Sequence, residues 1–204
     1  MPITINGSGT VTGISVGGLP DGIVDNDTIA NSTIAAGKCS FSPGKILQVV
    51  QTKRTSAQGY SNIDEGVFTS VGVSADITPS SANNFILIQA NINASTSGNH
   101  DVRTQIFKGG SVLATSTGDA DSSKTRATSS ASRGNNAGST TLTCLHLDPC
   151  TGWTSGALTY EIKVGHWDNS SIGVGVNHTW DWDSNNNALV ARVASHLILM
   201  EVAA

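Results

Sequence analysis

The chain has 204 residues and a formal net charge of -4, and only 13% of its residues are charged. That length accommodates one ordinary domain with an extension, and the few basic residues form no stripe, which excludes the electrostatic footprint of a nucleic-acid partner. Because Gly, Ser, Thr and Asn are abundant while helix-forming charged residues are scarce, the composition predicts an all-β protein.

Residues 1–42 space single apolar side chains among Gly, Ser, Asn and Asp. These side chains are too sparse to offset the conformational entropy of ordering, about 1 to 2 kcal/mol per residue, yet too regular for a solubilising tail. We therefore predict an extended segment that becomes ordered by burial against other copies of the chain or a larger assembly. The residues expected to mediate this attachment and the ordering of the copies are Ile3, Ile5, Val11, Ile14, Val16, Leu19, Ile23, Ile29 and Ile34.

Residues 43–204 are predicted to form a second unit, because apolar residues become dense after Pro43. Apolar runs bounded by turn residues predict eight to ten short strands. We expect these strands within residues 45–54, 83–93, 101–110, 111–117, 140–148, 157–165, 171–182, 187–193 and 195–202. The run at 45–54 is predicted to be buried on both faces. Two antiparallel sheets packed as a jelly-roll β-sandwich account best for this pattern, with a barrel as the next choice.

Several local patterns are specific enough to test. Leu158, Tyr160, Ile162 and Val164 alternate with polar residues, which predicts a strand with one face in water. Ile172 to Trp182 are predicted to alternate in the same way, with Gly173 and Gly175 on the face opposite the Trp residues. The Gly109-Gly110 pair predicts a hairpin turn. The polar stretch 117–140 predicts a long exposed loop of the kind that contacts partners.

The chain shows no apolar run of about 18 residues and no charged and apolar leader, so we expect a soluble protein made in the cytoplasm without membrane insertion. The three cysteines, Cys39, Cys144 and Cys150, are too few for an extracellular disulfide scaffold. Reduced thiols are expected, with a Cys144 to Cys150 bridge left open.

The opening segment resembles the N-terminal segments of tail-fibre and related virion proteins of tailed bacteriophages, particularly those of cyanobacterial and marine hosts. The similarity lies in GSGTVTGI at 7–14, GGLPDG at 17–22 and VDNDTIA at 24–30, about a sixth of the chain, with further likeness at 45–54, 77–89 and 195–202. Such proteins often carry trimeric β heads comparable with C1q-like jelly rolls. The resemblance implies a homotrimeric virion component and supplies no catalytic residues.

The resemblance leaves several locations on the virion open. Partners would be other virion proteins, either of the tail or baseplate or the major capsid protein, and a host surface glycan or protein. The first hypothesis is a short tail fibre or tail-tip protein that adheres to the host surface. Only about forty residues precede the predicted head, which departs from long shafted fibres and leaves a capsid decoration protein as the alternative. A glycan-degrading tailspike is a more remote alternative.

Two groups of residues were weighed as metal sites. His178, Asp181 and Asp183 fall on opposite faces of the predicted strand, and Cys144, His146 and Cys150 lack a fourth ligand. Ordinary polar turns and buried cysteines explain both groups better. We therefore expect no metal and no other cofactor.

No nucleophile elbow is present, and the few Glu residues do not pair, since Glu161 lies on a wet strand face and Glu201 is not expected to be a buried acid. We therefore expect no catalytic residues and no enzyme activity. Of the four Trp residues, Trp153, Trp167, Trp180 and Trp182, two or three are expected to fill the core or a subunit interface. Only Tyr60 and Trp153 are expected to be exposed for surface binding.

Overall fold

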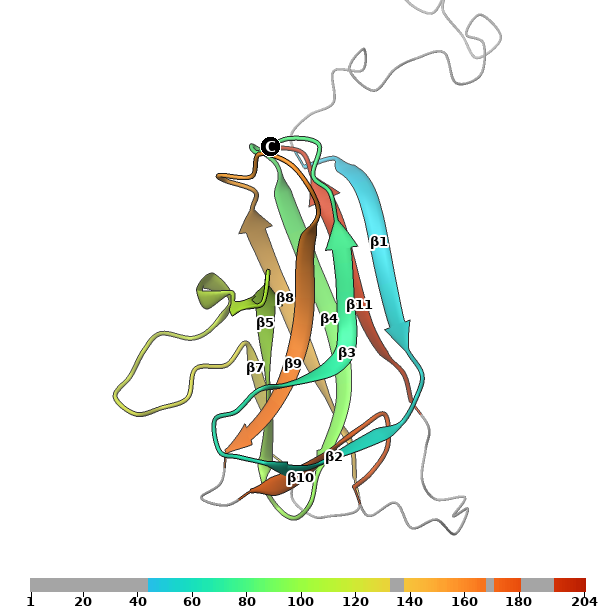
Figure 1. Ribbon diagram of the computed structural model, residues 1–204, viewed down its shortest axis with the longest axis vertical. Coiled ribbons are helices and arrows are strands. Elements are labelled where there is room, and N and C mark those ends of the chain that lie inside the picture. The colour runs from blue at the N-terminus through green and yellow to red at the C-terminus, as the bar shows by residue number, and fades with distance from the viewer. Residues whose placement is uncertain (1–43, 133–137, 168–170, 181–192) are drawn as a thin grey trace, which may run out of the picture. The chain divides into compact units, whose positions relative to one another are not determined.

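The computed structural model describes residues 44–132, 138–167, 171–180 and 193–204, which form two antiparallel β-sheets packed face to face (Figure 1). The prediction of an all-β antiparallel sandwich is therefore confirmed. The predicted segment 1–42, with its apolar residues and the boundary at Pro43, lies outside the described residues, as does nearly all of the strand predicted at 187–193.

Strands that follow one another along the chain mostly alternate between the two sheets. Sheet 1 contains β1 (Ile46–Arg54), β2 (Gln58–Ile63), β4 (Phe85–Thr96), β8 (Thr140–Pro149), β10 (Ile172–Val176) and β11 (Ser195–Val202). Sheet 2 contains β3 (Thr69–Ile77), β5 (Asp101–Lys108), β6 (Ser111–Val112), β7 (Ser129–Ala131) and β9 (Leu158–Trp167). A short 3-10 turn, η2 (Ala114–Ser116), follows β6. This repeated crossing between sheets is jelly-roll-like.

The core lies between the sheets and is built by period-two alternation. In sheet 1, β4 directs Ile86, Ile88 and Ile92 inward, each at most 1% exposed. In sheet 2, the predicted alternation of β9 is confirmed, since Tyr160 and Ile162 are buried and face the same way. The predicted hairpin is also confirmed, because Gly109 and Gly110 adopt φ of 57° and 83° between β5 and β6. Local patterns thus determined most of the core.

Strands β2, β3 and β7 were not predicted, and β7 lies within the stretch 117–140 that was predicted to be a loop. In β3 the signal was present, because Val71, Val73, Ala75 and Ile77 alternate and are all buried. It is interrupted at Gly72, whose φ of 65° accompanies a shift of register against β9. Strand β2 is almost wholly polar and is held by pairing with β10 rather than by its own apolar pattern.

The predicted strand at 171–182 ends early, at Val176. Asn177 adopts a φ of 63°, so the alternation does not continue to Trp180. Instead the Trp180 ring lies against Gly173, where an added Cβ would lie 2.0 Å from the ring. Trp180 therefore packs on the glycine side of β10, which corrects the predicted placement.

Strand β1 is not buried on both faces, contrary to the prediction for residues 45–54. It lies at one end of the order β1-β11-β4 and pairs with β11. Its outward side chains are exposed, with Ile46 at 50% and Val49 at 57%. The dense apolar run arises because this strand presents hydrophobic residues outward as well as inward.

Glu201 is a buried acid, which corrects the prediction. It occupies an inward position of β11, is 1% exposed, and receives hydrogen bonds from Gln48 Nε2 (2.7 Å), Asn84 Nδ2 (2.6 Å) and the backbone and side chain of Ser80 (both 2.7 Å). Burial raises the pKa of the Glu201 carboxyl, but these hydrogen bonds outweigh burial and hold the pKa below its ordinary value. The ionised carboxylate thus ties the end of β11 to β1 and to the β3–β4 connection.

This arrangement predicts a pH-dependent effect of Glu201→Gln. A carboxyl whose pKa is lowered in the folded state stabilises the fold above its unfolded pKa of about 4.3, and the contribution is lost as pH falls through the folded value. We expect the substitution to lower the free energy of unfolding by about 1 to 3 kcal/mol at neutral pH and by much less at acid pH. Urea denaturation at both pH values measures this, and an equal loss at both would contradict it.

Candidate functional site

The outer surface of sheet 1 carries an apolar face made by alternate residues of four strands. Because the neighbouring positions of β4, β8 and β11 are buried in the core, these side chains point away from it. We define the apolar face as Ile46, Leu47, Val49, Phe85, Leu87, Leu145, Leu147, Ile198, Met200 and Val202. Five of them are exposed by more than a third, up to 66% at Leu145.

Strand register shows that the apolar face is continuous. Val49 pairs with Met200, Met200 with Leu87, and Leu87 with Leu147, so one row crosses β1, β11, β4 and β8. With strands about 4.8 Å apart, the row spans roughly 14 Å. The row on one side begins at Ile46 and is apolar, continuing through Val202 and Phe85 to Pro149. The row on the other side is mixed, because Ile198 and Leu145 alternate with Gln51 and Gln89. The face is thus a patch rather than a scatter of exposed side chains.

The apolar face covers only one half of sheet 1. Farther along the strands the outward rows become polar, with Lys53 opposite His196 and Asn91 opposite Thr143. There, Thr143 Oγ1 donates to Asn91 Oδ1 at 3.0 Å. The apolar half is the end at which β1 begins and the chain ends, where Gly44 N–H donates to the Ala203 carbonyl (Figure 1).

Sheet 2 has a different outer surface. Its outward positions are mostly polar, as at Ser74, Glu161 and Lys163, and the Lys163 ammonium covers Phe107 at 4.1 Å from the ring centroid. The exposed apolar side chains Val112 and Trp167 lie on this sheet without forming a row like that of sheet 1. A polar outer surface is what solvent contact requires, whereas a contiguous apolar patch on an otherwise polar protein marks an interaction surface. The contrast between the two sheets makes sheet 1 the candidate interface.

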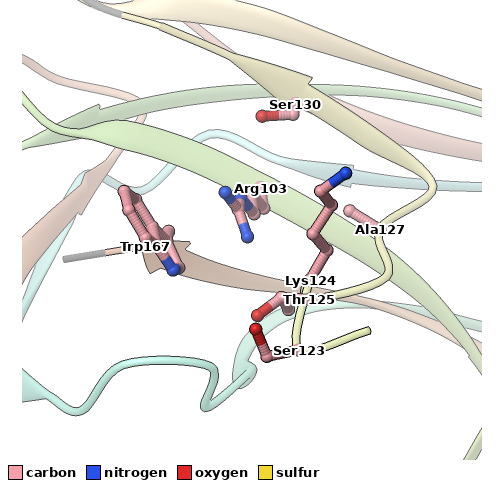
Figure 2. Close-up of a pocket in the computed structure, with 7 residues that line it drawn as sticks. All are labelled: Arg103, Ser123, Lys124, Thr125, Ala127, Ser130 and Trp167. Atoms are coloured by element: carbon pink, nitrogen blue, oxygen red, sulfur yellow. The ribbon is translucent and has the colours of Figure 1, made fainter. Parts of the chain in front are cut away.

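A pocket of about 470 Å³ lies over sheet 2 (Figure 2). It is lined by two cations, three hydroxyl groups, one methyl group and one indole, from Arg103, Lys124, Ser123, Thr125, Ser130, Ala127 and Trp167. Arg103 lies on β5, between Gly165 of β9 and Ser130 of β7. Figure 2 shows its guanidinium between the Trp167 ring and the Lys124 side chain. The volume of the pocket falls within the range of small-molecule sites.

Asp101 fixes the geometry of the Arg103 and Trp167 side of the pocket. Its Oδ2 accepts from Arg103 Nε at 2.8 Å, and its Oδ1 accepts from the Trp167 backbone N–H at 2.9 Å. The Arg103 guanidinium carbon lies 5.8 Å from the centroid of the Trp167 ring, within cation–π range. Trp167 is nevertheless 50% exposed. The indole is therefore positioned and still accessible.

The other side of the pocket is formed by the loop predicted at 117–140. Its described part is exposed over most of its length, as expected, but it is anchored to the sandwich. Gln105 Nε2 donates to the Arg126 carbonyl at 2.5 Å, and Arg126 Nε donates to the Gly118 carbonyl at 2.6 Å. These bonds hold Ser123 to Ala127 above the sheet. Residues 133–137 of the loop lie outside the described residues.

The two residues predicted for surface binding are not prominently exposed. Tyr60 is half-buried against the core, and its hydroxyl accepts from Arg54 Nη1 at 3.2 Å. Trp153 is half-buried too, with its Nε1 donating to the Gly156 carbonyl at 2.8 Å. A binding role for either stays a prediction. The exposed Trp167 was not singled out, although extending the alternation of β9 by three residues beyond Val164 would have placed it outward.

The first group of candidate ligands, Cys144, His146 and Cys150, does not form a metal site within the described residues. Cys144 and Cys150 are buried free thiols, so the open question of a bridge is settled against it. Cys144 Sγ lies 3.2 Å from Thr104 Oγ1, while His146 Nε2 lies 3.2 Å from Thr115 Oγ1. Burial raises the pKa of the Cys144 thiol. Within the described ranges, no group of three or more His, Cys, Asp or Glu side chains could hold an ion, whereas Asp181 and Asp183 lie outside those ranges.

Comparison with known proteins identifies no family. No protein-family model matches the chain, and no curated protein matches its sequence. Structures with a similar fold include infectious bursal disease virus, Gx strain, at 13% identity and a TM-score of 0.36. The match covers 80% of this chain and 39% of that chain, so this chain spans well under half of the viral one. In the part of the chain that the structure describes, no helix is long and apolar enough to cross a membrane.

Proposed function

We propose that the protein is a non-enzymatic structural component of a tailed-phage virion that assembles through the apolar face of sheet 1. In the first form of the proposal it is a short homotrimeric tail fibre or tail-tip protein. Residues 1–42 attach it to other virion proteins, and the sandwich is displayed for adhesion to the host surface.

The observation that carries the proposal is the apolar face itself. Four adjacent strands present ten apolar side chains outward on the same half of sheet 1, and they leave Leu145, Leu147 and Val49 about half exposed or more. Burying the exposed part of such side chains contributes about 25 cal/mol per Å² of apolar surface. Burial between copies also covers the edge strands β1 and β8, which would otherwise offer unpaired backbone groups.

The phage assignment is supported by the resemblance of residues 7–30 to the openings of phage virion proteins. A segment that gains order through intermolecular burial and a sandwich with an outward apolar face both require partner chains. The two features therefore support the same assembly role.

The second form of the proposal is a capsid decoration protein that uses the same apolar face to assemble on the phage head. Antibody-gold labelling of purified particles separates the two forms. Labelling of the tail tip supports a fibre, and labelling of the icosahedral shell supports decoration. A protein absent from purified particles overturns both. Release of reducing ends from host polysaccharide would instead indicate a tailspike enzyme.

A further inference from the structure

We infer that the pocket over sheet 2 binds an acidic sugar unit of a polysaccharide, with Trp167 stacking on the sugar ring and Arg103 and Lys124 binding its carboxylate. The inference rests on the proposed function only for where the ligand is met, on a host surface. The pocket lies on the opposite sheet from the apolar face, so the two surfaces can be tested separately.

The side chains that line the pocket match the chemistry of such a sugar. An indole face packs against the C–H face of a sugar ring. Trp167 is half exposed, its backbone N–H is bonded to Asp101, and its ring lies beside the Arg103 guanidinium. The hydroxyls of Ser123, Thr125 and Ser130 can donate to and accept from sugar hydroxyls. Such a combination of one aromatic platform and several convergent polar groups is typical of a small-ligand site.

The charges of the pocket select an acidic ligand. Its lining residues include two cations and no carboxylate. Asp101 binds the Nε of Arg103, so the terminal nitrogens are the ones that Arg103 can present to a ligand. Lys124 is paired with Asp121, but both side chains are more than 60% exposed, and pairs so exposed to water contribute little to stability. Lys124 can therefore exchange Asp121 for a sugar carboxylate at little cost.

Isothermal titration calorimetry with short oligomers of glucuronate, galacturonate and mannuronate tests the inference on the full-length chain. We expect at least one oligomer to bind. Its fully methyl-esterified form keeps the ring but loses the charge, so we expect its affinity to be lower by about tenfold or more. Trp167→Ala and Arg103→Gln are each expected to weaken binding by about tenfold or more, and Lys124→Gln by less because Lys124 is more exposed.

Lys53→Gln is the matched control, because it removes the same charge from the polar half of sheet 1. It should leave the affinity unchanged, and thermal unfolding should show that all variants fold. Failure of all three acidic oligomers to bind the wild-type chain overturns the inference. Equal binding of the methyl ester, or an equal loss in Lys53→Gln, also overturns it. A variant that cannot self-associate should still bind the sugar, because the pocket and the apolar face lie on different sheets. If the wild-type chain binds none of the oligomers, the assembly proposal is therefore unaffected.

Discussion

Replacement of Leu147 by aspartate is expected to dissociate the assembled protein into folded monomers. Leu147 is 48% exposed on its own chain and lies in the central row of the apolar face beside Leu87. In an isolated chain the new carboxylate would point into water. In an assembly that buries this row, each copy would place an uncompensated charge in an apolar interface, which costs several kcal/mol. Light scattering coupled to size-exclusion chromatography measures the change.

The control for this variant is Thr143→Asp. Thr143 lies on the same strand and the same face as Leu147, but in the polar half, where it pairs with Asn91. It introduces the same charge outside the apolar face, so we expect the assembly to persist. An assembled Leu147→Asp protein, or dissociation of both variants alike, would show that copies do not meet through this face.

The largest expected loss of stability follows from Asp148→Ala. Asp148 is 3% exposed, and its Oδ2 accepts from the Tyr160 hydroxyl at 2.6 Å and from Lys108 Nζ at 2.7 Å. Burial, with a further contribution from Asp148, raises the pKa of Tyr160, so the hydroxyl stays protonated and donates. The truncation leaves a fully buried hydroxyl and a half-buried ammonium without their acceptor. We expect the free energy of unfolding to fall by about 3 kcal/mol.

Urea denaturation at one fixed protein concentration measures this loss, since the stability of an assembling protein depends on concentration. Asp121→Ala provides the comparison, because it breaks an ion pair whose two members are exposed, and we expect a change within about 0.5 kcal/mol. Similar losses in the two variants would contradict the structural role given to Asp148. Tyr160→Phe should fall between them, because it removes one donor and leaves Lys108 paired.

Much of the fold could be predicted from sequence because period-two alternation carries it. In β9 the alternation identified both the strand and its buried side chains. The same rule failed where a backbone irregularity intervened, at Gly72 in β3 and at Asn177 after β10. Glu201 was misjudged for another reason. Its position in the alternation indicates the core, but the donors that satisfy its carboxylate come from Gln48, Ser80 and Asn84, more than a hundred residues away.

The candidate surfaces could be predicted only in part. Continuous apolar runs such as the one at 45–54 suggested burial on both faces, and the structure shows that the outer face of β1 is exposed on a single chain. Under the proposed assembly, that second burial occurs between copies. The pocket could not be predicted, because it combines Arg103, a distant loop and Trp167, and only strand pairing shows that these lie together.

Sedimentation velocity of the full-length chain at micromolar concentration tests most directly whether this protein functions by assembling through its apolar face. The account predicts a homotrimer with three times the 20.9 kDa mass of the chain, about 63 kDa. A single species at the mass of one chain throughout that concentration range would contradict it.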